Sequence, residues 1–280
     1  MRKKLQITHV AYRITLWYNC NMLLDEIVKA KHQEIVKLKK KLEQVKLPPV
    51  IEMPKLRDFK SAINQAGKIS LIAEIKKASP SAGEIIKSLD PASISKNYLE
   101  AGASAISVLT DQKFFKGKAE HLKQAKEAVS IPILRKDFII DESQVIESRL
   151  IRADAILLIV RLLDQGQLEK LVNLAQEYEM AALVEVRSEK EVEMALQAKA
   201  EIIGINNRDL DTLKVDFNTS LRISQKYAEL KNKILVSESG INSHSQIDEL
   251  KSAGFNAVLI GESILKNKSP QAKIKELMGQ

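Results

Sequence analysis

A glutamate and a lysine stand two positions apart at the end of an apolar run, within the stretch "LIAEIKKASPSAGEI" at residues 71–85. Alternate side chains of a strand point to the same face, so Glu74 and Lys76 share one face of the strand that we expect here. A buried charge is costly unless it is paired or used. A carboxylate beside an ammonium suits proton transfer, because burial and pairing can tune both pKa values.

Polar residues also end most of the other apolar runs of the chain. Any one of them could form a structural ion pair. Six of eight runs ending in charged, amide or Ser-Gly residues instead indicate a common site. These residues are Glu74 and Lys76; Arg135, Lys136 and Asp137; Glu185; Asn206; Glu238, Ser239 and Gly240; and Gly261, Glu262 and Ser263.

The elements that position these residues are eight short apolar runs separated by amphipathic stretches. The runs are continuous rather than alternating, as expected of strands buried on both faces of a parallel sheet. Eight strand–helix units in succession predict an α/β fold, a (β/α)8 TIM barrel, with its active site at the carboxyl ends of the strands. The runs span residues 70–75, 105–109, 132–137, 155–160, 181–186, 202–206, 234–239 and 257–261.

The last two run ends predict a phosphate site. Ser239-Gly240 and Gly261-Glu262-Ser263 follow the seventh and eighth runs, where barrels of this kind bind phosphate through backbone N–H groups of tight turns and a helix start. Glycine lets the backbone approach an anion without a Cβ in the way. The carboxylate of Glu262 would repel phosphate, so we expect its backbone N–H to face the ligand.

The remaining run ends form a second group suited to acid–base chemistry: Lys136, Glu185, Glu74, Asn206 and Lys76. No histidine ends any run, which disfavours His-based catalysis and His-rich metal sites. No G-x-G-x-x-G follows the first run, which weakens a dinucleotide-binding interpretation.

Composition limits the classes of function. The net charge of +8 divides into 11 basic against 4 acidic residues over 1–47, and 33 against 32 over 48–280. The main body is therefore close to neutral and lacks the basic face of a nucleic-acid binder. No apolar run approaches the roughly 20 residues of a membrane span. A single cysteine, Cys20, fits a reducing compartment, and we expect a cytoplasmic protein.

The N-terminal part differs from the rest. Residues 1–21 form an extension of unknown role, and Arg13 interrupts its apolar stretch, which argues against a secretory signal. We hypothesise that the functional chain begins at Met22. Residues 22–47 have helical apolar spacing and predict an amphipathic helix whose lysine run is solvated. This helix could cover the barrel bottom, its mouth or a partner. We expect one barrel domain over 22–280.

Several ordered motifs resemble the indole-3-glycerol phosphate synthase family, and they cover about residue 22 to the end. They are "IAEIKKASPSAG", "SVLTD" with "FFKG", "PILRKDFI", "ADAILLIV", "LVEV", "IGINNRDL", "SESGI" and "LIGES". The resemblance implies conversion of 1-(2-carboxyphenylamino)-1-deoxyribulose 5-phosphate to indole-3-glycerol phosphate, CO₂ and water, in tryptophan biosynthesis. It also implies that the first loop, "KASPSAG", folds over bound substrate.

The resemblance implies a role for each residue of the acid–base group. Lys136 matches the general acid that protonates the substrate ketone. Glu185 matches the proposed general base. Glu74 and Asn206 match residues that bind the sugar hydroxyls and assist loss of water. Lys76 matches a lysine near the phosphate and the departing hydroxyl. The division of proton transfers among Lys136, Lys76 and Glu185 stays open, because coupled groups share their titration.

The resemblance also implies the substrate-binding residues. An apolar slot for the anthranilate ring consists of Phe115, Phe138 and Leu157. The phosphate pocket consists of Ser239, Gly240, Gly261 and Glu262, and Ser79 of the first loop also binds substrate. No cofactor and no metal is implied. Besides the phosphorylated substrate we expect no nucleic-acid, membrane or fused isomerase partner.

Two other interpretations fit the barrel pattern. A phosphoribosyl isomerase would place a cysteine or an aspartate pair at strand ends, where this chain has Lys and Glu. A non-catalytic barrel acting as a binding subunit would be expected to lack Lys136 or Glu185, and both are present. Function has to be judged from such site residues and not from the fold alone.

Overall fold

The computed structural model describes residues 23–280, which form a closed barrel of eight parallel strands in the order β1-β10-β9-β8-β7-β6-β5-β4. The predicted barrel is confirmed, and every predicted run contains a strand. The expectations for residues 1–21 and for Met22 lie outside the described residues. The barrel strands are β1 Ser70–Ile75, β4 Ala105–Leu109, β5 Ile133–Lys136, β6 Ala155–Ile159, β7 Ala181–Val186, β8 Ile202–Asn206, β9 Ile234–Glu238 and β10 Ala257–Ile260.

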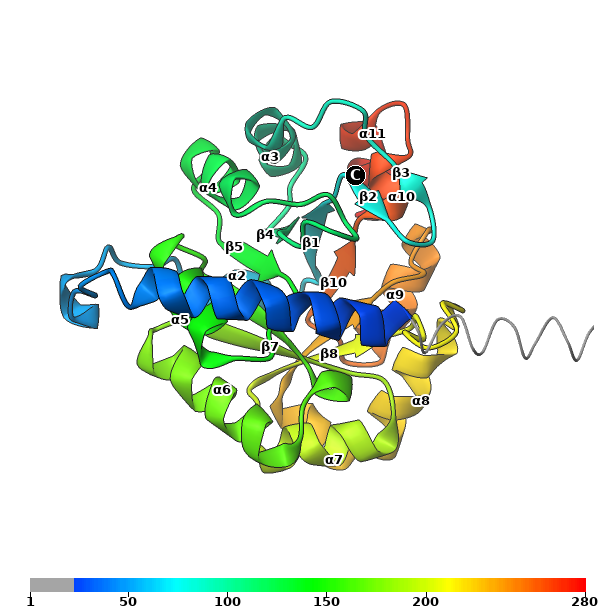
Figure 1. The fold of residues 1–280 in the computed structure, drawn as a ribbon. Coiled ribbons are helices and arrows are strands. Elements are labelled where there is room, and N and C mark those ends of the chain that lie inside the picture. Colours follow the sequence, from blue (N-terminus) through cyan, green and yellow to red (C-terminus); the bar gives the residue numbers. More distant parts are fainter. Residues whose placement is uncertain (1–22) are drawn as a thin grey trace, which may run out of the picture.

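Helices surround the strands as an outer ring (Figure 1). Most begin at an Asp or Ser whose side chain accepts a backbone N–H of the first turn, an interaction worth about 1 kcal/mol. The helices are α2 Phe59–Ile63, α3 Pro91–Glu100, α4 Ala119–Ala128, α5 Glu142–Leu150, α6 Gln165–Glu177, α7 Glu189–Gln197, α8 Asn218–Lys226, α9 His244–Ser252, α10 Glu262–Leu265 and α11 Pro270–Leu277, with the 3₁₀ helices η1 Val50–Glu52, η2 Val160–Leu162 and η3 Ala228–Asn232.

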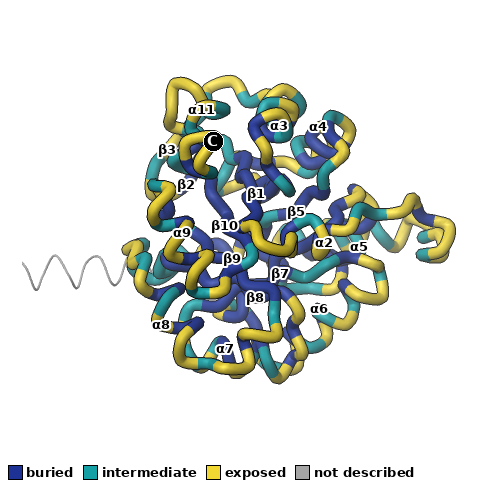
Figure 2. Tube along the Cα trace, turned by 180° about the vertical axis from the view of Figure 1, so that it is seen from behind, coloured by how far each residue is buried: buried dark blue, intermediate teal, exposed yellow. Residues whose placement is uncertain are grey.

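The apolar residues form two cores, as the continuous runs predict. One lies between the strands and the helix ring, and the other fills the barrel interior with side chains such as Ile72, Leu134 and Leu183. Phe59 and Ile63 of α2 join the interior core and close it below β1. Figure 2 shows the buried strands at the centre and the exposed positions on the periphery.

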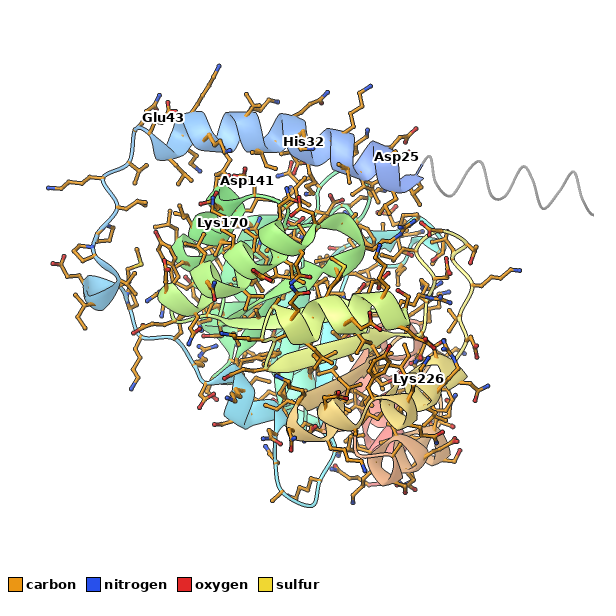
Figure 3. The ribbon with its side chains drawn as sticks, turned by 90° about the horizontal axis from the view of Figure 1, so that it is seen from below. Asp25, His32, Glu43, Asp141, Lys170 and Lys226 are labelled. Carbon is orange, nitrogen blue, oxygen red and sulfur yellow. The ribbon has the colours of Figure 1, made fainter. Side chains whose placement is uncertain are left out.

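The N-terminal helix, residues 23–42, lies across the mouth of the barrel (Figures 1 and 3). Its Ile27 packs in the interior core with Phe138 and Leu157, which settles which face it covers. The lysine run at 37–41 is exposed apart from half-buried Leu38, as predicted. The predicted end at residue 47 is not reached: the helix ends at residue 42 and a turn follows at 43–44. Leu47, directly before Pro48, is non-helical, as expected of a residue that precedes proline.

The first loop after β1 contains a two-stranded antiparallel hairpin, β2 Ala78–Ser79 and β3 Gly83–Glu84. Gly83 has a φ of 67°, in the left-handed region that favours glycine, so the turn requires this residue. Within residues 23–280, none of the helices has both the length and the apolar character needed to cross a membrane.

Candidate active site

A cavity of about 600 Å³ opens at the carboxyl ends of the strands, and we call it the mouth cavity. It brings together residues from all eight barrel strands, because parallel strands end on one side of a barrel. Its lining includes the predicted catalytic and substrate-binding residues except Ser79: Glu74, Lys76, Phe115, Lys136, Phe138, Leu157, Glu185, Asn206, Ser239, Gly240, Gly261 and Glu262. Arg135, which also ends a run, does not line the cavity and instead bonds to Ser148 and Glu147 of α5.

Lys136, at the end of β5, is held by carboxyl groups from β9 and β7. Its Nζ lies 2.5 Å from Glu238 Oε2 and 3.2 Å from Glu185 Oε2. Burial lowers the pKa of Lys136, but the carboxylates of Glu238, Glu185 and Glu74 together raise it by more, so the pKa lies well above its usual value. The side chain therefore enters the cavity as an ammonium, a proton donor whose position is fixed by its partners.

Glu74 and Lys76 form the pair that their spacing predicts, with 2.6 Å between Oε1 and Nζ. Burial raises the pKa of Glu74, but the two lysines Lys76 and Lys136 lower it below its usual value overall. Gly261 makes room for this carboxylate: a Cβ at Gly261 would lie 2.4 Å from Glu74 Oε1. The absence of a side chain at Gly261 therefore leaves room for Glu74, a role that was not predicted from the sequence for this glycine.

Glu238 is a site residue that the assignment of roles from sequence misses. It ends β9 and is 1% exposed, and its carboxylate is the nearest partner of Lys136. The pKa of Glu238 is raised to about 8, because burial and the neighbouring Glu185 outweigh the lowering by Lys136. A Cβ on Gly204 of β8 would lie 2.2 Å from Glu238 Oε1. The glycine in "IIGIN", beside a charged strand end, is the signal that could have identified it.

The turn after β9 has the shape of an anion-binding loop. Ser239 and Gly240 both have left-handed backbone, with φ of 67° and 77°. Successive backbone N–H groups in such turns form concave anion sites. Buried Asn207 supports the turn: its Nδ2 donates to Ser239 O at 3.0 Å and to Ser237 Oγ at 3.2 Å. Its Oδ1 accepts the backbone N–H of Ser220 at 3.0 Å.

Cations surround the same end of the cavity. Lys76, Arg208 and Lys266 line it, and Arg208 and Lys266 were not among the residues predicted from sequence. Glu262 lies 2.6 Å from Lys266 Nζ and 3.5 Å from Arg208 NH2. The hydrogen bond from Lys266 lowers the pKa of Glu262, so this carboxylate is neutralised by neighbours. This end of the cavity can therefore accept an anion despite Glu262.

The opposite side of the cavity is apolar. The rings of Phe115 and Phe138 lie 5.9 Å apart between centroids and are tilted by 43°. Leu157 and Ile159 of β6 line the cavity beside them. A flat aromatic group bound here would contact rings and aliphatic side chains, while its polar substituents reach the charged groups.

Ser79 lies outside the mouth cavity. It lines a smaller recess of about 100 Å³ between the N-terminal helix and the first loop. Its Oγ accepts the backbone N–H of Ala82 at 3.1 Å, so in this structure it stabilises the hairpin of its own loop. Local hydrogen bonding of this kind is common for serine in turns and is not visible from strand-end position.

Comparisons with known proteins identify the family. The sequence model of the family "Indole-3-glycerol phosphate synthase" matches residues 24–277. An indole-3-glycerol phosphate synthase from Polaromonas naphthalenivorans is 42% identical over 268 residues, covering 92% of this chain and 99% of the relative. One from Aquifex aeolicus is 44% identical over 240 residues, covering 86% and 91%.

Solved structures support the fold alone. A 3-hexulose-6-phosphate synthase is 16% identical with a TM-score of 0.59, covering 75% of this chain and 99% of that one. The family match, by contrast, extends over nearly all described residues and includes every residue that lines the charged part of the cavity. The chain belongs to the indole-3-glycerol phosphate synthase family.

Proposed function

We propose that this chain converts 1-(2-carboxyphenylamino)-1-deoxyribulose 5-phosphate to indole-3-glycerol phosphate with Lys136 as the acid of ring closure. The observation that carries the proposal is the position of Lys136. Its ammonium is held by Glu238 and Glu185 in a cavity that has an apolar slot on one side and cations with a left-handed turn on the other. A cytoplasmic location is part of the proposal.

The two ends of the cavity match the two ends of the substrate. The anthranilate ring fits the apolar slot of Phe115, Phe138 and Leu157. The phosphate fits the turn at Ser239-Gly240 and the segment at 261–263, with Lys76 and Arg208 beside it. In this orientation the ketone carbon between the two groups lies near Lys136. Binding at both ends holds the ring carbon against the ketone, which lowers the entropic part of the barrier.

Ring closure forms a carbon–carbon bond and disrupts aromaticity. The ring carbon that carries the carboxylate attacks the ketone carbon, and the carbonyl electrons go to oxygen. Lys136 gives that oxygen a proton and leaves a hydroxyl group. The carbon–carboxylate bond then breaks, CO₂ departs, and its bonding electrons restore the aromatic ring.

Dehydration completes the indole. The hydroxyl leaves as water after it takes a proton from an ammonium, and the ring nitrogen supplies the electrons that expel it. A base removes a proton from the adjacent CH₂ group. We assign this base to Glu185, and Glu74 and Asn206 bind the sugar hydroxyls. Lys76, paired with Glu74 at 2.6 Å, is suited to protonate the leaving hydroxyl.

Fluorescence of the indole product tests the proposal. Wild-type protein mixed with the substrate is expected to generate indole fluorescence, and Lys136→Met is expected to lower kcat about 10²–10⁴-fold, the usual loss for a general acid. Lys170→Met is the matched control, since Lys170 is exposed and pairs with Glu142 on the outer helices (Figure 3). Full activity of Lys136→Met would move the acid role to Lys76, and an inactive, folded wild-type protein would refute the function.

A further inference from the structure

The N-terminal helix carries one lysine that is buried at the barrel mouth. Lys31 is 2% exposed, whereas the lysine run further along the same helix is solvated. Its Nζ lies 2.8 Å from Asp137 Oδ1, 2.9 Å from Asp111 Oδ2 and 2.8 Å from Glu34 Oε2. A charge removed from water in this way is retained only when carboxylates surround it.

The two barrel carboxylates that bind Lys31 also bind the backbone beside the apolar slot. Asp111 Oδ1 accepts the backbone N–H groups of Phe114 at 2.8 Å and Phe115 at 3.2 Å. Asp137 Oδ1 accepts the N–H of Phe138 at 2.8 Å. Lys31 therefore holds two carboxylates, and each of them bonds the backbone N–H of one of the slot residues, Phe115 or Phe138.

The same helix contacts the slot directly. Ile27, one turn before Lys31, packs in a common apolar cluster with Phe138 and Leu157, and Phe115 lies at the edge of that cluster. Leu23 and Ile27 also line the small recess beside Phe115 and Phe138. The helix thus meets the slot through an apolar contact and, one turn later, through a buried ion cluster.

The cluster is held from the barrel side as well. Asp137 Oδ2 accepts Thr110 Oγ1 at 2.5 Å and Arg135 NH2 at 3.1 Å. Burial raises the pKa of Asp137, but Arg135 and Lys31 lower it to about 2. Asp137 is therefore ionised in the folded protein. Within residues 23–280, Lys31 is the cation that pairs with Asp111.

We propose that Lys31 is a positioning residue for the apolar slot: by binding Asp111 and Asp137 together, it fixes the distance and tilt of Phe115 and Phe138 and so the affinity for the aromatic part of the ligand. The inference rests on the proposed function, in which this slot receives the anthranilate ring. It predicts a defect confined to ligands that carry an aromatic ring, because the phosphate turn at 239–240 lies on the other side of the cavity.

Two ligands separate this role from a general stabilising role. Indole-3-glycerol phosphate has both an aromatic ring and a phosphate, while glycerol 3-phosphate has the phosphate end alone. In Lys31→Met we expect the Kd for indole-3-glycerol phosphate to rise at least tenfold and the inhibition constant of glycerol 3-phosphate to change less than twofold. Lys31→Arg, which restores a cation, is expected to recover most of the lost affinity.

Lys39→Met is the matched control. Lys39 lies two turns further along the helix and pairs with Asp141 at 2.7 Å, and neither residue lines the mouth cavity or the small recess. We expect this variant to bind both ligands like wild type. Equal loss of affinity for both ligands in Lys31→Met, or no loss for either, would overturn the inference.

Folding is followed by circular dichroism and thermal unfolding, because Lys31→Met leaves buried carboxylates without their shared cation. If that variant does not fold, Lys31→Met/Asp111→Asn removes one of those charges and is tested with the same two ligands. Failure of both to fold would also overturn the inference, since the cluster would then be a requirement for folding. A wild-type protein that binds neither ligand would refute the proposed function instead.

Discussion

Glu238 Oε2 lies 2.5 Å from Lys136 Nζ, although the two residues are 102 positions apart and belong to strands β9 and β5. They meet because both side chains point into the barrel mouth. The pair is completed by Glu185 at 3.2 Å, so one ammonium is placed between two carboxylates. The number of protons bound at the site therefore depends on Lys136, Glu238 and Glu185 together and not on Lys136 alone.

Glu238→Gln is expected to change how stability depends on pH. Burial raises the pKa of Glu238 from 4.5 to about 8, so the folded protein holds a proton that the unfolded chain releases between these values. The stability contributed by this group is complete below pH 4.5 and is lost as pH rises through 8. Urea unfolding at pH 5 and pH 8.5 should show wild type losing stability relative to Glu238→Gln. Parallel pH profiles of the two proteins would contradict the assignment.

Gly261→Ala is expected to displace Glu74. The added methyl group would lie 2.4 Å from Glu74 Oε1 and 2.9 Å from its Cβ, so the carboxylate must leave its contact with Lys76. The backbone at Gly261 has a φ of −130°, outside the left-handed region that favours glycine, so the substitution adds no positive-φ strain; circular dichroism checks that the variant folds. We expect kcat/KM to fall about 10²-fold, the loss typical of misplacing a group at an active site.

Gly166→Ala is the control for that substitution. A Cβ at Gly166, in helix α6, would meet only Asp164 Oδ1 at 3.5 Å, an ordinary contact. Steady-state kinetics should show wild-type values for Gly166→Ala. A Gly261→Ala protein with unchanged kcat/KM would mean that Glu74 can move without loss of function.

Asn207→Asp is expected to weaken phosphate binding. The change removes the two N–H donors that bond Ser239 O at 3.0 Å and Ser237 Oγ at 3.2 Å, and it places a negative charge beside the turn. An unsatisfied buried group costs about 1–3 kcal/mol, and a loss near the lower end of that range raises KM roughly tenfold. The inhibition constant of glycerol 3-phosphate should rise by a similar factor, while exposed Asn218→Asp leaves both values unchanged.

Asp154→Ala tests stability away from the site. Asp154 is buried just before β6 and binds Lys126, the backbone N–H of Ile133 at 2.7 Å and that of Arg57 at 2.7 Å. Breaking a buried ion pair by removing one partner costs about 3–5 kcal/mol. Chemical denaturation should show this loss, and kcat of the folded variant should be unchanged. A large fall in kcat without loss of stability would contradict this structural role.

The sequence by itself determined the features that depend on local periodicity. The eight strands, the capped helices and the common face of Glu74 and Lys76 follow from the repeat of side-chain direction in strands and from N-cap chemistry. The family motifs then assigned roles to residues at strand ends. Those roles could be placed in one cavity because a parallel barrel brings all carboxyl ends of its strands together.

Only the tertiary structure decided which distant groups are partners. Lys31 looks like one more lysine of a charged helix, yet it is buried on Asp111 and Asp137, more than 75 positions away. Ser79, for which the resemblance implies substrate binding, bonds within its own hairpin in this structure. Gly261 serves the carboxylate of Glu74 across the barrel. Pairing, room and burial of this kind depend on distances between segments remote in sequence, which residue spacing along the chain does not encode.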